Sequence, residues 1–118
     1  MNTLELKEDF TVLEEGTQYE LPQYEVIDGK GIKMIDGPGQ LISFVRGSKL
    51  AGEDVPKREG TLHEHLLAMM IYDLQYKNKL VPSREGSLII TKLQEALGWL
   101  RQRQIDRTKR NVVGTYNE

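Results

Sequence analysis

The chain has 118 residues, a formal net charge of −2 at pH 7, 38% hydrophobic and 29% charged residues, and no cysteine. This length and composition predict a globular chain of one domain, and they exclude a chain that is mostly disordered. The lack of cysteine excludes disulfides, thiolate metal sites and thiol nucleophiles. No apolar run approaches a membrane span, and residues 1–10 do not resemble a signal peptide. We therefore expect a cytoplasmic protein that does not enter a membrane.

The charges are distributed unevenly along the chain. Residues 5–28 are strongly acidic, with Lys7 as their only basic residue. Residues 101–110 are strongly basic, with Asp106 as their only acidic residue. Such a basic segment can complement the C-terminal end of a helix dipole, or it can bind an anionic ligand or an acidic neighbouring subunit. Charge alone leaves these alternatives open.

The first half of the chain has the pattern of short β-strands. Its runs of β-branched, aromatic and aliphatic residues are separated by dipeptides that favour tight turns, Asp28-Gly29 and Asp36-Gly37. We predict a small antiparallel meander, formed by residues 19–21, 24–27, 31–35 and 40–46. The strand expected to be best buried contains Leu41, Ile42, Phe44 and Val45.

The second half has the pattern of a helical hairpin. The stretch from Thr61 to Glu64 matches a capping box that would start a helix. Ser83 is placed to cap a second helix, which we expect to end near Arg110. The predicted core face of the first helix holds Leu62, Leu66, Leu67, Met70, Ile71 and Leu74, and its opposite stripe holds His65, Met69, Tyr72 and Tyr76. The predicted core face of the second helix holds Ile89, Ile90, Leu93, Leu97 and Leu100.

These elements predict an α+β fold, with a small N-terminal antiparallel β-sheet followed by a C-terminal two-helix hairpin. We expect a single domain over residues 1–118, with a sheet part at 1–47, a linker at 48–60, and the helical hairpin and tail at 61–118. Short strands and two helices can bury only a thin core. The sequence therefore predicts a homo-oligomer.

The basic segment contains the constellation most indicative of a binding site. Arg103, Arg107 and Arg110 share one side of the second helix, with Trp99 one turn earlier. Guanidinium groups bind phosphate oxygens in bidentate fashion and stack on flat rings. A phosphate-bearing ligand would satisfy both tendencies, whereas the simpler alternative is an exposed helix end with Trp99 in the core. Tyr76 is either a half-buried packing residue or a stacking wall for a base.

The sequence offers little for catalysis or for metal binding. His63 and His65 are two residues apart and point to different sides of a helix, so they cannot chelate one metal ion. The segments around Gly29 and Gly37 lack the spacing of a phosphate-binding loop. No serine has a convincing base and orienting acid, and no pair of carboxylates is marked as acid and base. We expect no enzymatic activity, no catalytic residue, no metal and no cofactor.

Several segments of the second half resemble the Thoeris anti-defence sponge family. The resemblance also extends to the anti-CBASS cyclic nucleotide sponges, which share the helical hairpin. It rests on residues 65–68, on Tyr76, on residues 82–87, 95–103 and 106–107, on 114–116, and on the Phe44-Val45-Arg46-Gly47 segment of the first half. The family pattern differs at two positions, since it has Asn where this chain has Gly86 and Lys where it has Asn78.

The resemblance implies a phage protein that sequesters immune second messengers in the cytoplasm of the infected host. It implies a hexamer with a pocket for cyclic ADP-ribose isomers, in which Tyr76 stacks on the ligand, Gly86 lies at the pocket, and Arg103 and Arg107 bind phosphate. A second pocket, with Arg46 and the loop around Asn78, would take cyclic oligonucleotides.

Two other functions compete with this interpretation. A nucleic-acid-binding protein could lay its basic C-terminal helix along a phosphate backbone, and its affinity would fall steeply with salt. The acidic first half argues against polynucleotide binding. A plain interaction module, whose basic helix docks on acidic proteins, would respond to no nucleotide.

Overall fold

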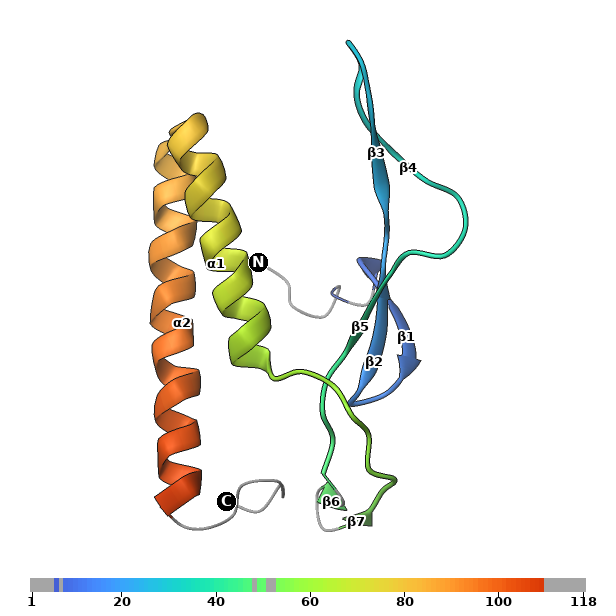
Figure 1. Ribbon diagram of the computed structural model, residues 1–118, viewed down its shortest axis with the longest axis vertical. Coiled ribbons are helices and arrows are strands. Elements are labelled where there is room, and N and C mark those ends of the chain that lie inside the picture. Colours follow the sequence, from blue (N-terminus) through green and yellow to red (C-terminus); the bar gives the residue numbers. More distant parts are fainter. Residues whose placement is uncertain (1–5, 7, 48, 51–52, 110–118) are drawn as a thin grey trace. The chain divides into compact units, whose positions relative to one another are not determined.

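The computed structural model describes residues 6, 8–47, 49–50 and 53–109, and it confirms an α+β chain with small antiparallel sheets followed by two helices (Figure 1). The chain divides into two compact units. The β unit comprises residues 1–46 and 58–60, and the helical unit comprises residues 47–57 and 61–118. The predicted single domain with a linker at 48–60 stays a prediction.

Within its described residues, the β unit has five short strands in two separate sheets. They are β1 (Thr11–Glu14), β2 (Gln18–Leu21), β3 (Tyr24–Ile27), β4 (Gly31–Met34) and β5 (Gln40–Ser43). The first sheet has the order β1-β2-β5, and β3 and β4 form a hairpin of their own, with all pairs antiparallel. The predicted meander is therefore wrong, because β2 pairs with β5 rather than with β3. Pro22, which has no amide hydrogen, lies between β2 and β3 and interrupts the strand ladder there.

The two predicted turn dipeptides have different roles. The Asp28-Gly29 turn closes the β3–β4 hairpin, with Gly29 at φ 75° and the Lys30 amide donating to the Ile27 carbonyl over 2.9 Å. Asp36-Gly37 instead lies between strands of different sheets, with Gly37 at φ 106°. The first turn is confirmed as a hairpin turn, and the second lies in the loop that connects β4 to β5 of the other sheet.

The core of the β unit differs from the predicted one. Leu41 and Val45, expected to be among the best buried, are 58% and 43% exposed. Burial is centred instead on Thr17, whose hydroxyl donates to the Phe44 carbonyl over 2.7 Å, and on Arg46. Edge-to-face contacts join the rings of Phe10, Tyr19 and Phe44. Aromatic and polar side chains thus take the place expected for aliphatic ones.

The helical unit contains β6 (Lys49–Leu50), β7 (Glu53–Asp54), α1 (His63–Leu80) and α2 (Arg84–Lys109). The predicted capping box is wrong, because Leu62 is the N-cap of α1 and makes no side-chain capping hydrogen bond. Thr61 lies in a β-bridge, so its backbone is not at the capping position. Ser83 does cap α2, since its hydroxyl accepts a hydrogen bond from the Gly86 amide at 2.9 Å.

The two helices form an antiparallel hairpin joined by a short turn (Figure 1). Ile71 of α1 and Leu97 of α2 are 6% and 9% exposed and form the centre of the seam. Met70 and Ile89, both predicted on core faces, are 43% and 48% exposed. Tyr72 and Tyr76, on the opposite stripe, are exposed, so the alternative that makes Tyr76 a half-buried packing residue is wrong for the single chain. Neither described helix has the length and apolar character that a membrane crossing would need.

Candidate functional site

The turn of the helical hairpin brings together two of the predicted ligand-binding residues, Asn78 and Gly86. The Asn78 Oδ1 atom accepts a hydrogen bond from the Ser83 amide at 3.1 Å, and its Nδ2 atom donates to the Ser87 hydroxyl at 3.3 Å. A Cβ atom built on Gly86 would lie only 3.0 Å from Asn78 Cγ. The Asn78 amide therefore fills the space that a larger side chain at position 86 would need.

This contact links the two positions at which the chain departs from the sponge-family pattern. The prediction assigned Gly86 and Asn78 to different pockets, whereas the structure makes them neighbours. A glycine at 86 and an asparagine at 78 fit one another, because the lack of a side chain at 86 leaves room for the folded-back amide of Asn78. The two departures thus form one local arrangement.

Tyr76 lies on α1, close to the same turn. Its side chain is 59% exposed, and Tyr72, one helical turn earlier, is also exposed. A tyrosine with an exposed ring on a helix can stack on a planar ligand. Tyr76, Asn78 and Gly86 all lie toward the closed end of the hairpin.

Arg103 and Arg107 lie toward the other end of α2. They are four residues apart and share one flank of the helix, with Arg103 exposed and Arg107 half-buried. Trp99, one turn before Arg103, is 76% exposed, so the interpretation that places it in the core of this chain is wrong. Arg110 lies outside the described residues.

The distance along α2 separates these two groups of predicted residues. Arg103 follows Gly86 by 17 residues in one continuous helix, and at the usual rise this places them about 25 Å apart. A small cyclic nucleotide cannot span that length. A single chain therefore does not bring Tyr76 and Gly86 together with Arg103 and Arg107.

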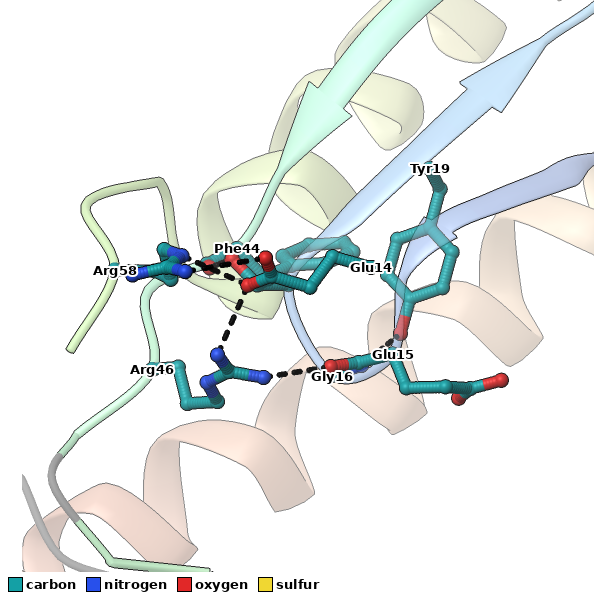
Figure 2. A network of polar contacts seen from close by, with 8 residues as sticks. Glu14, Glu15, Gly16, Tyr19, Phe44, Arg46 and Arg58 are labelled. Carbon is teal, nitrogen blue, oxygen red and sulfur yellow. Dashed lines mark hydrogen bonds and ion pairs between the residues drawn. The ribbon is translucent and has the colours of Figure 1, made fainter. Parts of the chain in front are cut away.

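Arg46 lies in the β unit, at the centre of a polar network (Figure 2). Its side chain donates to Glu14 Oε2 over 2.9 Å and to the Glu15 carbonyl over 2.8 Å. Arg58 binds the same Glu14 carboxylate through its Nε atom at 2.8 Å and its second terminal nitrogen at 3.3 Å. Arg46 is 7% exposed, so its guanidinium is a buried cross-link within its own unit.

Glu14 and Arg58 are the residues of this network that sequence reasoning missed. The hydrogen bond from Arg58, together with the charges of Arg58 and Arg46, lowers the pKa of the Glu14 carboxyl. Arg58 follows Glu14 by 44 positions and lies in a segment that looked like a linker. No local sequence pattern indicates that Arg58 pairs with Glu14, apart from the excess of acidic residues in the first half of the chain.

Comparison with known proteins adds a relative for part of the chain. A 60-residue segment is 45% identical to "Thoeris anti-defense 1" of Bacillus phage SBSphiJ7. The chain is thus similar to a Thoeris anti-defence protein. The match covers 50% of this chain and 42% of the relative, so the chain spans less than half of the relative's length. No protein-family model matches the chain.

Proposed function

We propose that this protein is a phage anti-defence sponge, which captures a cyclic ADP-ribose-type or cyclic oligonucleotide messenger without cleaving it. The observation that carries this proposal is the 45% identity to Thoeris anti-defense 1 over 60 residues. The proposal places the protein in the cytoplasm of the infected bacterium. It also makes the protein a binder rather than an enzyme, because sequestration by itself deprives the host effector of its signal.

We propose further that the pocket for cyclic ADP-ribose isomers is built from more than one subunit. The separation of about 25 Å between Gly86 and Arg103 along α2 supports this arrangement. One copy would contribute Tyr76 and Gly86 from the closed end of its hairpin, and a second copy would contribute Arg103 and Arg107. Two hairpins lying side by side in opposite directions would place these ends together.

The exposed apolar residues of the hairpin support such an assembly. Trp99, Leu80 and Val81 are each more than half exposed in the single chain. Large exposed apolar surfaces mark interfaces in soluble proteins, because covering them removes apolar area from water. The resemblance to the sponge family suggests a hexamer.

In this pocket the two arginines would bind the phosphates of the messenger. Guanidinium–phosphate hydrogen bonds are charge-assisted, and enclosure between subunits would reduce their screening by water. Stacking on Tyr76 would add apolar contact and orient the base. Together these contacts are suited to nanomolar affinity, which corresponds to about −12 kcal/mol.

The proposed second pocket, with Arg46 and Asn78, has weaker support. Arg46 is already bonded to Glu14 and Glu15, and Asn78 is already bonded to Ser83 and Ser87. A cyclic oligonucleotide at either side chain would have to replace these hydrogen bonds. For this reason we place the function mainly at Tyr76, Gly86, Arg103 and Arg107.

The proposal is tested by capture and release. The protein is incubated with a cyclic ADP-ribose isomer, separated from unbound ligand by gel filtration and then denatured by heat, and the released nucleotide is identified by mass spectrometry. We expect the intact messenger from the wild type and none from Arg103→Ala, whereas Lys92→Ala should behave like the wild type because Lys92 lies elsewhere on α2.

Three results would contradict the proposal. Release of a hydrolysed nucleotide would indicate an enzyme. Salt-sensitive binding of polynucleotides without messenger capture would favour the nucleic-acid-binding alternative. If no nucleotide changes the melting temperature of the protein, the result would favour a plain interaction module.

A further inference from the structure

The helical unit has a shallow groove between α1 and α2 that is separate from the proposed messenger pocket. It has a volume of about 420 Å³, within the usual range for small-molecule sites. Its floor is apolar and its rim is polar. The lining residues are Ala68, Ile71, Tyr72 and Gln75 of α1, and Gln94, Leu97, Gly98 and Arg101 of α2.

Gly98 is the first indication that a group from outside the chain occupies this groove. It lies in the interior of α2, where glycine is a poor helix former. A Cβ atom at this position would meet nothing within 4 Å. Packing within the chain therefore does not require a glycine, whereas a flat ring approaching the helix backbone would. Ala68, the small residue across the seam on α1, widens the same space.

The rim of the groove indicates the chemistry of that group. Tyr72 offers an exposed ring for stacking, and the amides of Gln75 and Gln94 offer both donors and acceptors for the edge of a base. Arg101 brings the positive charge. Among the described residues no carboxylate forms a salt bridge with it.

Arg101 lines both this groove and a second pocket further along the hairpin. That pocket has a volume of about 480 Å³ and is lined by Glu64, Arg101, Gln104, Ile105, Thr108 and Lys109. The second pocket has Lys109 as well as Arg101, but its Glu64 carboxylate would repel an anion. No carboxylate of the described residues lines the first groove, so we place the phosphate on the Arg101 side of that groove. Arg101 precedes Arg103 by two residues and thus points to a different flank of α2 from Arg103 and Arg107.

We propose that this groove binds a nucleoside phosphate, with its base over Gly98 beside Tyr72 and its phosphate at Arg101. The site goes beyond the proposed messenger pocket, because it uses neither Arg103 nor Arg107 and lies on one hairpin. It would allow the chain to recognise common nucleotides in addition to the sequestered signal.

Calorimetric titration of the full chain with AMP, adenosine and inorganic phosphate tests this proposal. We expect AMP to bind at least about tenfold more tightly than adenosine or phosphate alone, because it alone engages both the floor and Arg101. Arg101→Gln should lower AMP affinity about tenfold and leave adenosine unchanged. Gly98→Leu should abolish binding of both nucleoside ligands by filling the groove. Lys92→Gln, on the outer face of the same helix, should bind AMP like the wild type.

Other outcomes would overturn the proposal. One is a failure of the wild type to bind AMP, and another is equal weakening by Arg101→Gln and Lys92→Gln. A third is that Gly98→Leu dissociates the oligomer, as measured by light scattering, while Arg101→Gln leaves AMP affinity unchanged. That result would assign the groove to an interface between copies of the chain. Circular dichroism checks that each variant keeps its helices.

Discussion

The β unit and the helical unit use arginine in different ways. In the β unit, Arg46 and Arg58 converge on one carboxylate, Glu14, and hold segments that are far apart in the sequence. In the helical unit, Arg101 and Arg103 are exposed on different flanks of a single helix, and the ion pairs Lys77–Asp73 and Lys92–Glu95 are local surface contacts. A cation therefore has a structural role where an acid distant in sequence pairs with it, and it is suited to ligand binding where a helix exposes it to solvent.

The two units also differ in what holds them together. The helical hairpin depends on an apolar seam around Ile71 and Leu97, whereas the β unit buries Thr17 and Arg46 among hydrogen bonds. The stability of the helical unit should therefore fall when a seam side chain loses volume, and the stability of the β unit should fall when a buried charge is removed.

Truncation of the seam should give the largest effect. Leu97→Ala should lower the free energy of unfolding by about 3 kcal/mol, because a buried leucine leaves a cavity. Chemical denaturation followed by the helical circular dichroism signal measures this loss. Leu88→Ala is the matched control on the same helix, since Leu88 is half exposed and should cost under about 1 kcal/mol. Equal losses in the two variants would contradict the assignment of the seam.

Removal of the buried guanidinium should have the second-largest effect on stability. Arg46→Ala should lower the free energy of unfolding by about 2 kcal/mol, because it removes charge-assisted hydrogen bonds to Glu14 and Glu15. Near-ultraviolet circular dichroism of the tyrosines in the β unit follows the transition. Arg103→Ala, an exposed arginine of the helical unit, should leave that transition unchanged. A stable Arg46→Ala protein that loses only cyclic oligonucleotide binding would instead support the predicted second pocket.

Removal of the α2 cap should have a smaller effect. Ser83→Ala should cost about 1 kcal/mol, because the Gly86 amide loses its acceptor. Thr91→Ala is the control, since its hydroxyl bonds to the Ser87 carbonyl in the helix interior, and alanine is the better helix former there. Thermal unfolding should show a lower midpoint for Ser83→Ala only, and an unchanged midpoint in this variant would argue against the cap.

The smallest expected effect is on the pH dependence of stability. Arginine partners hold the pKa of Glu14 below its ordinary value of 4.5, so its ionised form is favoured by folding. This contribution is fully present above pH 4.5 and is lost as the pH falls through the lower pKa of the folded state. Glu14→Gln should therefore be less stable than the wild type at pH 7, and the difference should shrink toward pH 3. A difference that stays constant over this range would contradict an ionic role for Glu14.

The sequence predicted the helical unit more completely than the β unit. The residues that define α1 and α2 lie close together in the chain, so apolar spacing and Ser83 sufficed to predict the hairpin. The pairing of β2 with β5 joins Tyr19 to Ile42 across a long stretch of chain, and no local pattern distinguished it from a β2–β3 pairing. The first strand, β1, has only four residues and lies within the acidic stretch, so it was missed, and its pairing of Thr11 with Glu20 appears only in the structure.

The candidate site was predicted unevenly for the same reason. The flank with Arg103 and Arg107 follows from helical spacing alone, and the structure has both on α2. The neighbourhood of Asn78 and Gly86 depends on how the turn folds back, which spacing cannot give. The network around Arg46 depends on Glu14 and Arg58, which are remote in sequence, so a ligand role was assigned to a residue that has structural contacts.

The proposed messenger pocket needs the closed end of one hairpin and the basic flank of another. Subunit mixing tests this claim directly, with Tyr76→Ala chains and Arg103→Ala chains that are each inactive in capture. Equal amounts of the two variants are unfolded and refolded together. We predict that about a quarter of the wild-type capacity for a cyclic ADP-ribose isomer returns, because random assembly gives that share of pockets an intact Tyr76 from one variant and an intact Arg103 from the other. Recovery of no capacity, in mixed oligomers of normal mass, would contradict the account and place each pocket within a single chain.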